Sequence, residues 1–385
     1  MKKFLKTLTF VLVLSFLSTS LYAQEKLWNE LNAQANNLYQ QGRYKEVLNV
    51  VKDALKVAEK TFGSDHPNVA QSLNNLALLY HSLGKYTEAE QLYEQALEIL
   101  EKTLGSNHPN VAQSLNNLAE LYRVQGKYNE AEPLYKQALA IAERAVGKDH
   151  PNVAQSLNNL AELYQDQGKY AEAEPLYKRA LAIAEKTLGS NHPNVATYLN
   201  NLAVLYKVQG KYVEAESLYK RALNVVETSL EPDHPKVATY LNNMAELYKA
   251  QGKYVEAEPL LKQALVIAEK ALGKDHPQFA ASLKNMALLY KAQGKYTEAE
   301  SLLRQALAIV EKALGPDHPY VAKVLSGLGE LYKAQGKYAE AELFYKRALV
   351  IAEKALGLEN PEVEILLENI AKIYQKLGKK AELER

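Results

Sequence analysis

The stretch NHPNVAQSLNNLAELYRVQGKY, residues 107–128, recurs in close copies that begin at Asp149, Asn191, Asp233, Asp275 and Asp317. Seven His-Pro pairs mark the same period of 42 residues, and Asn360-Pro361 continues it once more. The histidines of these pairs are His66, His108, His150, His192, His234, His276 and His318. A fixed period of this size indicates a repeat array rather than the two or three globular domains that 385 residues would otherwise suggest.

Each unit is predicted to form two helices joined by a tight turn. In the first full unit, Pro67 suits the first turn of a helix, and Gly105 suits the position just beyond the end of one. Gly84 interrupts the apolar pattern between them. The pattern therefore predicts a first helix over 67–83, called helix A, and a second over 86–104, called helix B.

Each predicted helix carries one apolar stripe when its residues are placed at about 100° per step around the axis. The stripe of helix A contains Leu73, Leu76, Ala77 and Tyr80, and that of helix B contains Tyr86, Ala89, Leu92, Tyr93, Ala96 and Leu97. The opposite side of helix A carries Gln71, Asn75, Leu78 and Ser82. A single pair of helices cannot bury both stripes, so neighbouring units must stack on one another.

These residues carry a family resemblance. Leu76-Ala77, Tyr80, Gly84, Tyr86, Ala89, Tyr93 and Ala96 resemble the signature of the tetratricopeptide repeat. The 42-residue unit and the phrases HPNVAQSLNNLA and GKYxEAExLYxxAL are most similar to the kinesin light chain subclass, over about residues 24–378. The resemblance implies an all-α fold, an α-solenoid of antiparallel helix pairs in a right-handed superhelix with helix A lining the concave side. Because the chain has no heptad segment for a heavy chain, the resemblance extends to the binding mode and not to a motor role.

The repeat divides the chain into four parts. We expect a signal peptide over 1–23, a degenerate N-terminal cap over 24–65, and a C-terminal capping helix with a charged stub over 360–385. Between them lie seven units, 66–107, 108–149, 150–191, 192–233, 234–275, 276–317 and 318–359. The apolar residues of the last helix leave open whether it docks on another molecule.

The N-terminal segment resembles a bacterial secretory signal peptide. Three lysines precede a short apolar run over 8–17, and the small Ala23 precedes Gln24. We therefore expect a mature protein that starts at Gln24 and is periplasmic or secreted, with a retained membrane anchor as the alternative. No later segment is apolar enough to span a membrane.

Composition and motifs argue against several classes of function. Lys plus Arg (46) and Asp plus Glu (45) nearly cancel, so no field favours nucleic acid, and the absence of cysteine excludes disulfides and thiolate chemistry. Equivalent histidines in stacked helices lie about 8–10 Å apart, too far to share a zinc ion at about 2 Å, so the His-Pro corners are predicted to be structural. Glu88, Glu90 and similar carboxylates are predicted to be solvated surface. We expect no catalytic residue, metal or cofactor, and no enzymatic activity.

A series of asparagines is the strongest functional signal. The ladder amides, one per helix A, are Asn75, Asn117, Asn159, Asn201, Asn243, Asn285 and Asn369, and Gly327 interrupts them. An amide has both a donor and an acceptor, so it suits the main chain of a peptide. A repeat step of about 10 Å matches roughly three residues of extended ligand. The alternative is that these amides bond between adjacent helices or were inherited through repeat duplication.

Charged residues follow the ladder along helix A. The basic row consists of Arg123, Lys207, Lys249, Lys291 and Lys333, and Glu120, Glu162, Glu246 and Glu330 lie nearer the middle. We therefore predict a scaffold for an extended peptide whose acidic residues approach the basic row, with a plain solvated face as the alternative for that row. The alternative function is a structural envelope protein that self-associates through its end units.

Overall fold

The structure, a computed structural model, describes the backbone of residues 2–379 and the side chains of residues 21–379. Within that part of the chain every regular element is an α-helix and no strand is present. The predicted all-α class is confirmed. The predicted charged stub ends at Arg385, and its part beyond Lys379 lies outside the described residues.

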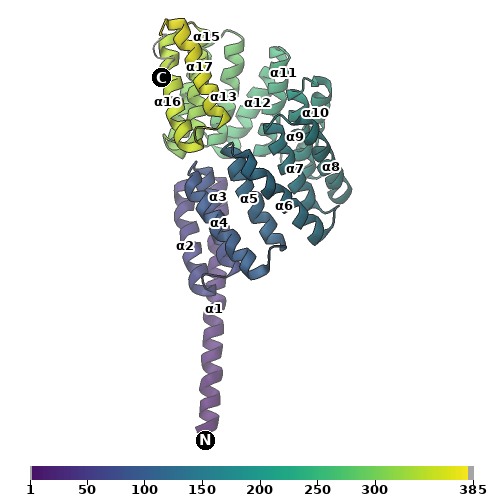
Figure 1. Ribbon diagram of the computed structural model, residues 1–385, viewed down its shortest axis with the longest axis vertical. Helices are drawn as coiled ribbons and strands as arrows, with labels where there is room; N and C mark the ends of the chain where they lie inside the picture. The colour runs from purple at the N-terminus through teal and green to yellow at the C-terminus, as the bar shows by residue number, and fades with distance from the viewer. Residues whose placement is uncertain (1, 380–385) are drawn as a thin grey trace. The chain divides into compact units, whose positions relative to one another are not determined.

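Helices of types A and B alternate along the chain, and within residues 1–117 and within residues 118–385 each helix lies beside its neighbour in sequence (Figure 1). The A helices are α1 (Lys2–Gln40), α3 (Pro67–Ser82), α5 (Pro109–Val124), α7 (Pro151–Asp166), α9 (Pro193–Val208), α11 (Pro235–Ala250), α13 (Pro277–Ala292), α15 (Pro319–Ala334) and α17 (Pro361–Leu377). The B helices are α2 (Tyr44–Phe62), α4 (Tyr86–Leu104), α6 (Tyr128–Val146), α8 (Tyr170–Leu188), α10 (Tyr212–Ser229), α12 (Tyr254–Leu272), α14 (Tyr296–Leu314) and α16 (Tyr338–Leu356). Helix A of the first full unit thus ends one residue before the predicted 83.

The chain forms two compact units, residues 1–117 and 118–385, with the boundary inside α5. The backbone of α1 in the first unit is helical without a break through the expected processing position before Gln24. None of the described helices is both long and apolar enough to cross a membrane.

The His-Pro corners cap the A helices. In all seven, the ring Nδ1 accepts a hydrogen bond from the backbone N–H two residues later, at 3.0 to 3.2 Å. Asn360 does the same for α17 through its Oδ1, at 2.9 Å. The proline that follows each cap sits where a helix needs no donor. The predicted structural role of these histidines is confirmed.

The core lies between stacked helices. Around Tyr135 of α6, for example, Ala119, Ala131, Leu160 and Leu163 form one buried cluster drawn from three consecutive helices. Most of the predicted stripe positions are buried, including Leu73, Leu76 and Ala77 of α3. Tyr80, Leu92 and Leu97 are only half-buried. Lys85 Nζ lies 5.7 Å from the centre of the Tyr80 ring.

Within the second unit, one contact joins residues far apart in sequence. The side-chain Nδ2 of Asn360 donates to the backbone oxygen of Val124, at 3.1 Å. The turn glycine between α5 and α6, Gly126, faces Asn360 and Pro361 so closely that a Cβ at residue 126 would lie 3.0 Å from Pro361 Cδ. The N-terminus of α17 therefore packs on the α5–α6 turn.

Candidate functional site

The surface carried by the ladder amides and the basic row is called here the helix A face. Three ladder amides tie neighbouring A helices together instead of facing solvent. Asn75 donates to Asn32 Oδ1 at 3.0 Å, Asn201 to Asn158 Oδ1 at 2.9 Å, and Asn243 to Asn200 Oδ1 at 2.8 Å. At these three positions the alternative from the sequence is confirmed, because the amides bond between adjacent A helices.

Each acceptor lies in the preceding A helix, one residue before the ladder position of that helix. The sequence did not predict a role for these residues. These leading amides are Asn32, Asn74, Asn116, Asn158, Asn200 and Asn242. Asn116, Asn158, Asn200 and Asn242 are buried. The Asn-Asn dipeptide of α3, α5, α7, α9 and α11 was the available signal, because a buried amide beside a half-buried one suggests helix-to-helix bonding.

The other four ladder amides differ from one another. Asn117 accepts from Gln113 at 3.0 Å, and Asn369 donates to the backbone oxygen of Ile365 at 3.0 Å. Asn159 of α7 and Asn285 of α13 are half-buried and make no hydrogen bond with any residue that the structure describes. These two amides keep both their donor and their acceptor available to a ligand.

The basic row is paired within the protein, which the sequence did not predict. Lys207 and Lys249 both contact Glu246, at 3.5 and 3.1 Å, and Lys291 contacts Glu330 at 2.5 Å. Burial of Glu246 favours its neutral form, but the two lysines outweigh that effect, so the pKa of Glu246 is lowered. The last cation of the row, Lys333, donates to Asn369 Oδ1 at 2.6 Å.

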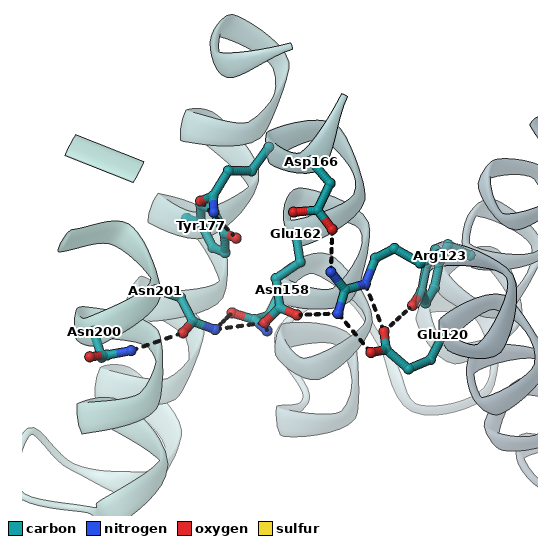
Figure 2. Close-up of polar contacts among 10 residues, drawn as sticks. Glu120, Arg123, Asn158, Glu162, Asp166, Tyr177, Asn200 and Asn201 are labelled. Atoms are coloured by element: carbon teal, nitrogen blue, oxygen red, sulfur yellow. Dashed lines mark hydrogen bonds and ion pairs between the residues drawn. The ribbon is translucent and has the colours of Figure 1, made fainter. Parts of the chain in front are cut away.

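Arg123 is the most enclosed cation of the row. Its guanidinium contacts Glu120 at 2.6 Å and Glu162 at 3.5 Å, and it also pairs with Asp166 (Figure 2). Burial alone would lower the pKa of Arg123, but the hydrogen bond and charge of Glu120, with the other two carboxylates, raise it above its ordinary value. Arg123 is therefore a structural cation that stays charged.

The amides and the charges belong to one network in this part of the second unit. Asn201 Nδ2 donates to Glu162 Oε1 at 2.7 Å, and Asn158 Nδ2 donates to the same oxygen at 2.8 Å (Figure 2). Burial, with the charges of Glu120 and Asp166, raises the pKa of Glu162 despite the opposing effect of Arg123. Helices α5, α7 and α9 thus share a polar layer that aligns them.

A further repeated contact joins one tyrosine in each of four A helices to helix B of the preceding repeat. Tyr164 donates to Glu132, Tyr206 to Glu174, Tyr248 to Glu216 and Tyr332 to Glu300, at 2.6 to 3.1 Å. Hydrogen bonds from Lys178, Tyr206 and Lys211 lower the pKa of Glu174 to about 2, against the effect of burial. Glu90 occupies the same repeat position and is half-buried, so its predicted solvation is wrong, whereas Glu88 is exposed as expected.

Two pockets open on the helix A face, one in each unit. The pocket of the first unit, 470 Å³, is lined by amides of α3 and α5 that include Asn75, Asn110 and Asn117. The pocket of the second unit, 290 Å³, lies among α13, α15 and α17 around Gly327, where the ladder is interrupted. The described residues contain no group of three or more side chains placed to hold a metal ion.

Comparison with known proteins gives a family match. The family model described as tetratricopeptide repeat matches residues 27–102, 70–144, 110–186, 152–227, 194–270, 236–312 and 278–354. No curated protein matches the chain.

Several solved structures are similar to the chain. One, from Podosopora anserina, is described as a kinesin light chain with nearly identical TPR-like repeats. Its sequence is 34% identical, and the match covers 53% of this chain and 97% of that one, with a TM-score of 0.44. BtubC (BKLC) from P. vanneervenii is 24% identical over 66% of this chain and 91% of its own, with a TM-score of 0.46. A tetratricopeptide repeat protein from Parabacteroides merdae ATCC 43184 is 22% identical over 78% and 98%, with a TM-score of 0.48.

Proposed function

The chain belongs to the tetratricopeptide repeat family, and from this premise we propose that it is a non-catalytic scaffold that binds an extended segment of a partner protein along the helix A face. Proteins built from such repeats generally act by binding other proteins. The N-terminal pattern supports the further proposal that the scaffold is exported and works in the periplasm or outside the cell.

The binding proposal rests on two half-buried amides, Asn159 and Asn285, which bond to no other residue that the structure describes. Because both side chains are only half-buried, a peptide main chain can reach them, and each amide can then donate one hydrogen bond and accept another. The pocket around Gly327, in the same unit as these two amides, supplies a place for a side chain of the segment.

Acidic residues of the segment would approach the basic row. Because Lys207, Lys249 and Lys291 already contact Glu246 and Glu330, a ligand carboxylate has to share or replace those glutamates. Such an exchange contributes more to selectivity than to affinity, since one ion pair replaces another.

The alternative, self-association through the end units, has less support at the C-terminal end. In α17, Glu364 and Glu368 are exposed at the positions where α5 buries Ala112 and Asn116. A charged outer face of this kind is typical of a terminal cap that stays in water. The large apolar residues exposed in α17 are Ile365 and Leu367.

The test is a selection of random peptides on the full chain, followed by affinity measurement for each enriched peptide. The double variant Asn159→Ala/Asn285→Ala is expected to bind about tenfold or more weakly, because each lost hydrogen bond contributes about 1 kcal/mol. The matched control is Asn129→Ala/Asn224→Ala, which removes two exposed amides from B helices. Enrichment of no peptide, or equal affinity in both double variants, would reject the proposal.

A further inference from the structure

The pocket of the second unit lies where the Asn-Asn pair of α3, α5, α7, α9 and α11 is absent. The leading position of α13 holds Lys284, and the two positions of α15 hold Ser326 and Gly327. These two small residues line the 290 Å³ pocket together with Lys284. Neither Ser326 nor Gly327 therefore supplies an amide toward Lys284 as Asn201 of α9 does toward α7.

Lys284 also lacks the carboxylate that α7 carries one helical turn after the leading position. In α7 the leading amide Asn158 donates to Glu162, one helical turn later. The equivalent of Glu162 in α13 is Leu288, so Lys284 has no acid one turn away on its own helix. Its Nζ instead lies 5.8 Å from the centre of the Tyr320 ring.

Both carboxylates that line the pocket are already paired with other lysines. Glu330 contacts Lys291 at 2.5 Å, and Glu362 contacts Lys323 at 2.7 Å. No carboxylate of the described residues lies within ion-pair distance of Lys284. Burial, followed by the positive charge of Lys323, lowers the pKa of Lys284. An ammonium group in this setting is stabilised by any anion that enters the pocket.

The rest of the pocket wall is apolar. Leu288, Ala322, Ile365 and Leu366 line it. Ile365 is 56% exposed, although its position holds glutamine in α3, α5 and α7. An exposed isoleucine at the rim of a pocket can contact an aliphatic side chain of a bound partner.

We propose that this pocket anchors the partner segment by an acidic side chain next to a large aliphatic one, with the carboxylate on Lys284 Nζ and the aliphatic group against Leu288 and Ile365. The proposal rests on the proposed function and adds the chemistry of the ligand at one place. A singly charged carboxylate fits better than a phosphate, because Glu330 and Glu362 in the wall repel a dianion and the apolar side gives a phosphate no contact.

The test uses the full chain labelled with ¹³C at the Cδ1 methyl of isoleucine, which makes Ile365 observable by NMR. The probes are short capped Gly/Ser peptides with a central Leu-Asp, Leu-Asn, Ala-Asp or Leu-phosphoserine pair. The variant is Lys284→Asn, which restores the residue found at this position in α3, α5, α7, α9 and α11 and so preserves the fold. The matched control is Lys312→Asn, which removes an exposed lysine of α14.

The Leu-Asp peptide is expected to shift the Ile365 methyl and to bind about tenfold more tightly than the Leu-Asn peptide, because a charge-assisted contact is lost in the amide. Lys284→Asn should remove that preference, and Lys312→Asn should retain it. The proposal is overturned if Leu-Asp does not shift Ile365 at millimolar concentration, if Lys284→Asn keeps the preference, or if the phosphoserine peptide binds most tightly. Binding that depends on Asn159 and Asn285 but not on Lys284 would leave the proposed function intact and reject the pocket alone.

Discussion

His276 and its six equivalents show how a single side chain starts a helix in this protein. The ring Nδ1 has to be unprotonated to accept the backbone N–H of Gln278, so the cap exists only in the form without a proton on that nitrogen. The positive end of the helix dipole and burial both disfavour a charged ring at this place. Burial accordingly lowers the pKa of His276. The same backbone contact is made by Asn360, which does not titrate in this range.

Replacement of His276 by alanine should lower the free energy of unfolding by about 1 kcal/mol, the usual effect of losing an N-cap. The folded state binds the His276 proton less tightly than the unfolded chain does, so this contribution is complete above a pH of about 6.5 and is lost as pH falls through the folded pKa. His276→Asn should keep the cap and remove this dependence. Urea unfolding at pH 7.5 and 5.5 measures both effects. If acid destabilises the Asn variant as much as the wild type, His276 does not titrate as described.

At the scale of helices and turns, Asn360 performs two tasks. It caps α17 and donates to Val124, so the start of the last helix is attached to the α5–α6 turn. Gly126 permits this contact because it has no Cβ, and it differs from Gly210 in the α9–α10 turn, which has nothing within 4 Å of an added Cβ. The two glycines have nearly the same backbone angle, with φ of 76° and 74°.

Alanine at Gly210 should destabilise the protein by about 1 kcal/mol, the cost of the left-handed conformation for a residue with a Cβ. Alanine at Gly126 should cost about 1 kcal/mol more, because its methyl group also overlaps Pro361. Urea unfolding of the two variants side by side checks the difference, and Gly210→Ala is the control for backbone strain. Equal losses would show that α17 does not pack on the α5–α6 turn in solution.

At the scale of the whole molecule, stability comes from contacts between consecutive helices. Each buried cluster joins one repeat to the next, as Ala161, Ala173, Tyr177, Leu202 and Leu205 do in the second unit. The Tyr–Glu and Asn–Asn hydrogen bonds have the same nearest-neighbour range. Arrays of this kind unfold as coupled units, so a defect at one interface divides the array.

Ala203→Asp places a carboxylate at a fully buried position of α9. A buried charge without a partner should destabilise that interface by about 3 kcal/mol or more, and the array should then unfold in two steps. Differential scanning calorimetry measures the number of transitions, with Ala250→Asp, at an exposed position of α11, as the control. A single sharp transition with an unchanged midpoint would contradict the stacking described here.

The sequence by itself determined the period, the helix type and, to within one residue, the bounds of the first full helix pair, because these depend on local signals: His-Pro at the start, glycine after the end, and apolar residues at helical spacing. It also indicated which face of helix A is polar. Only the tertiary structure decided which polar residues on that face remain available. Asn159 and Asn201 are equivalent in sequence, yet Asn201 bonds to α7 and Asn159 bonds to nothing described. The physical reason is that each side chain of helix A meets residues of other repeats: Glu162 accepts a hydrogen bond from Asn201, whereas its equivalent one repeat earlier, Glu120, accepts from Arg123 and Tyr135 instead.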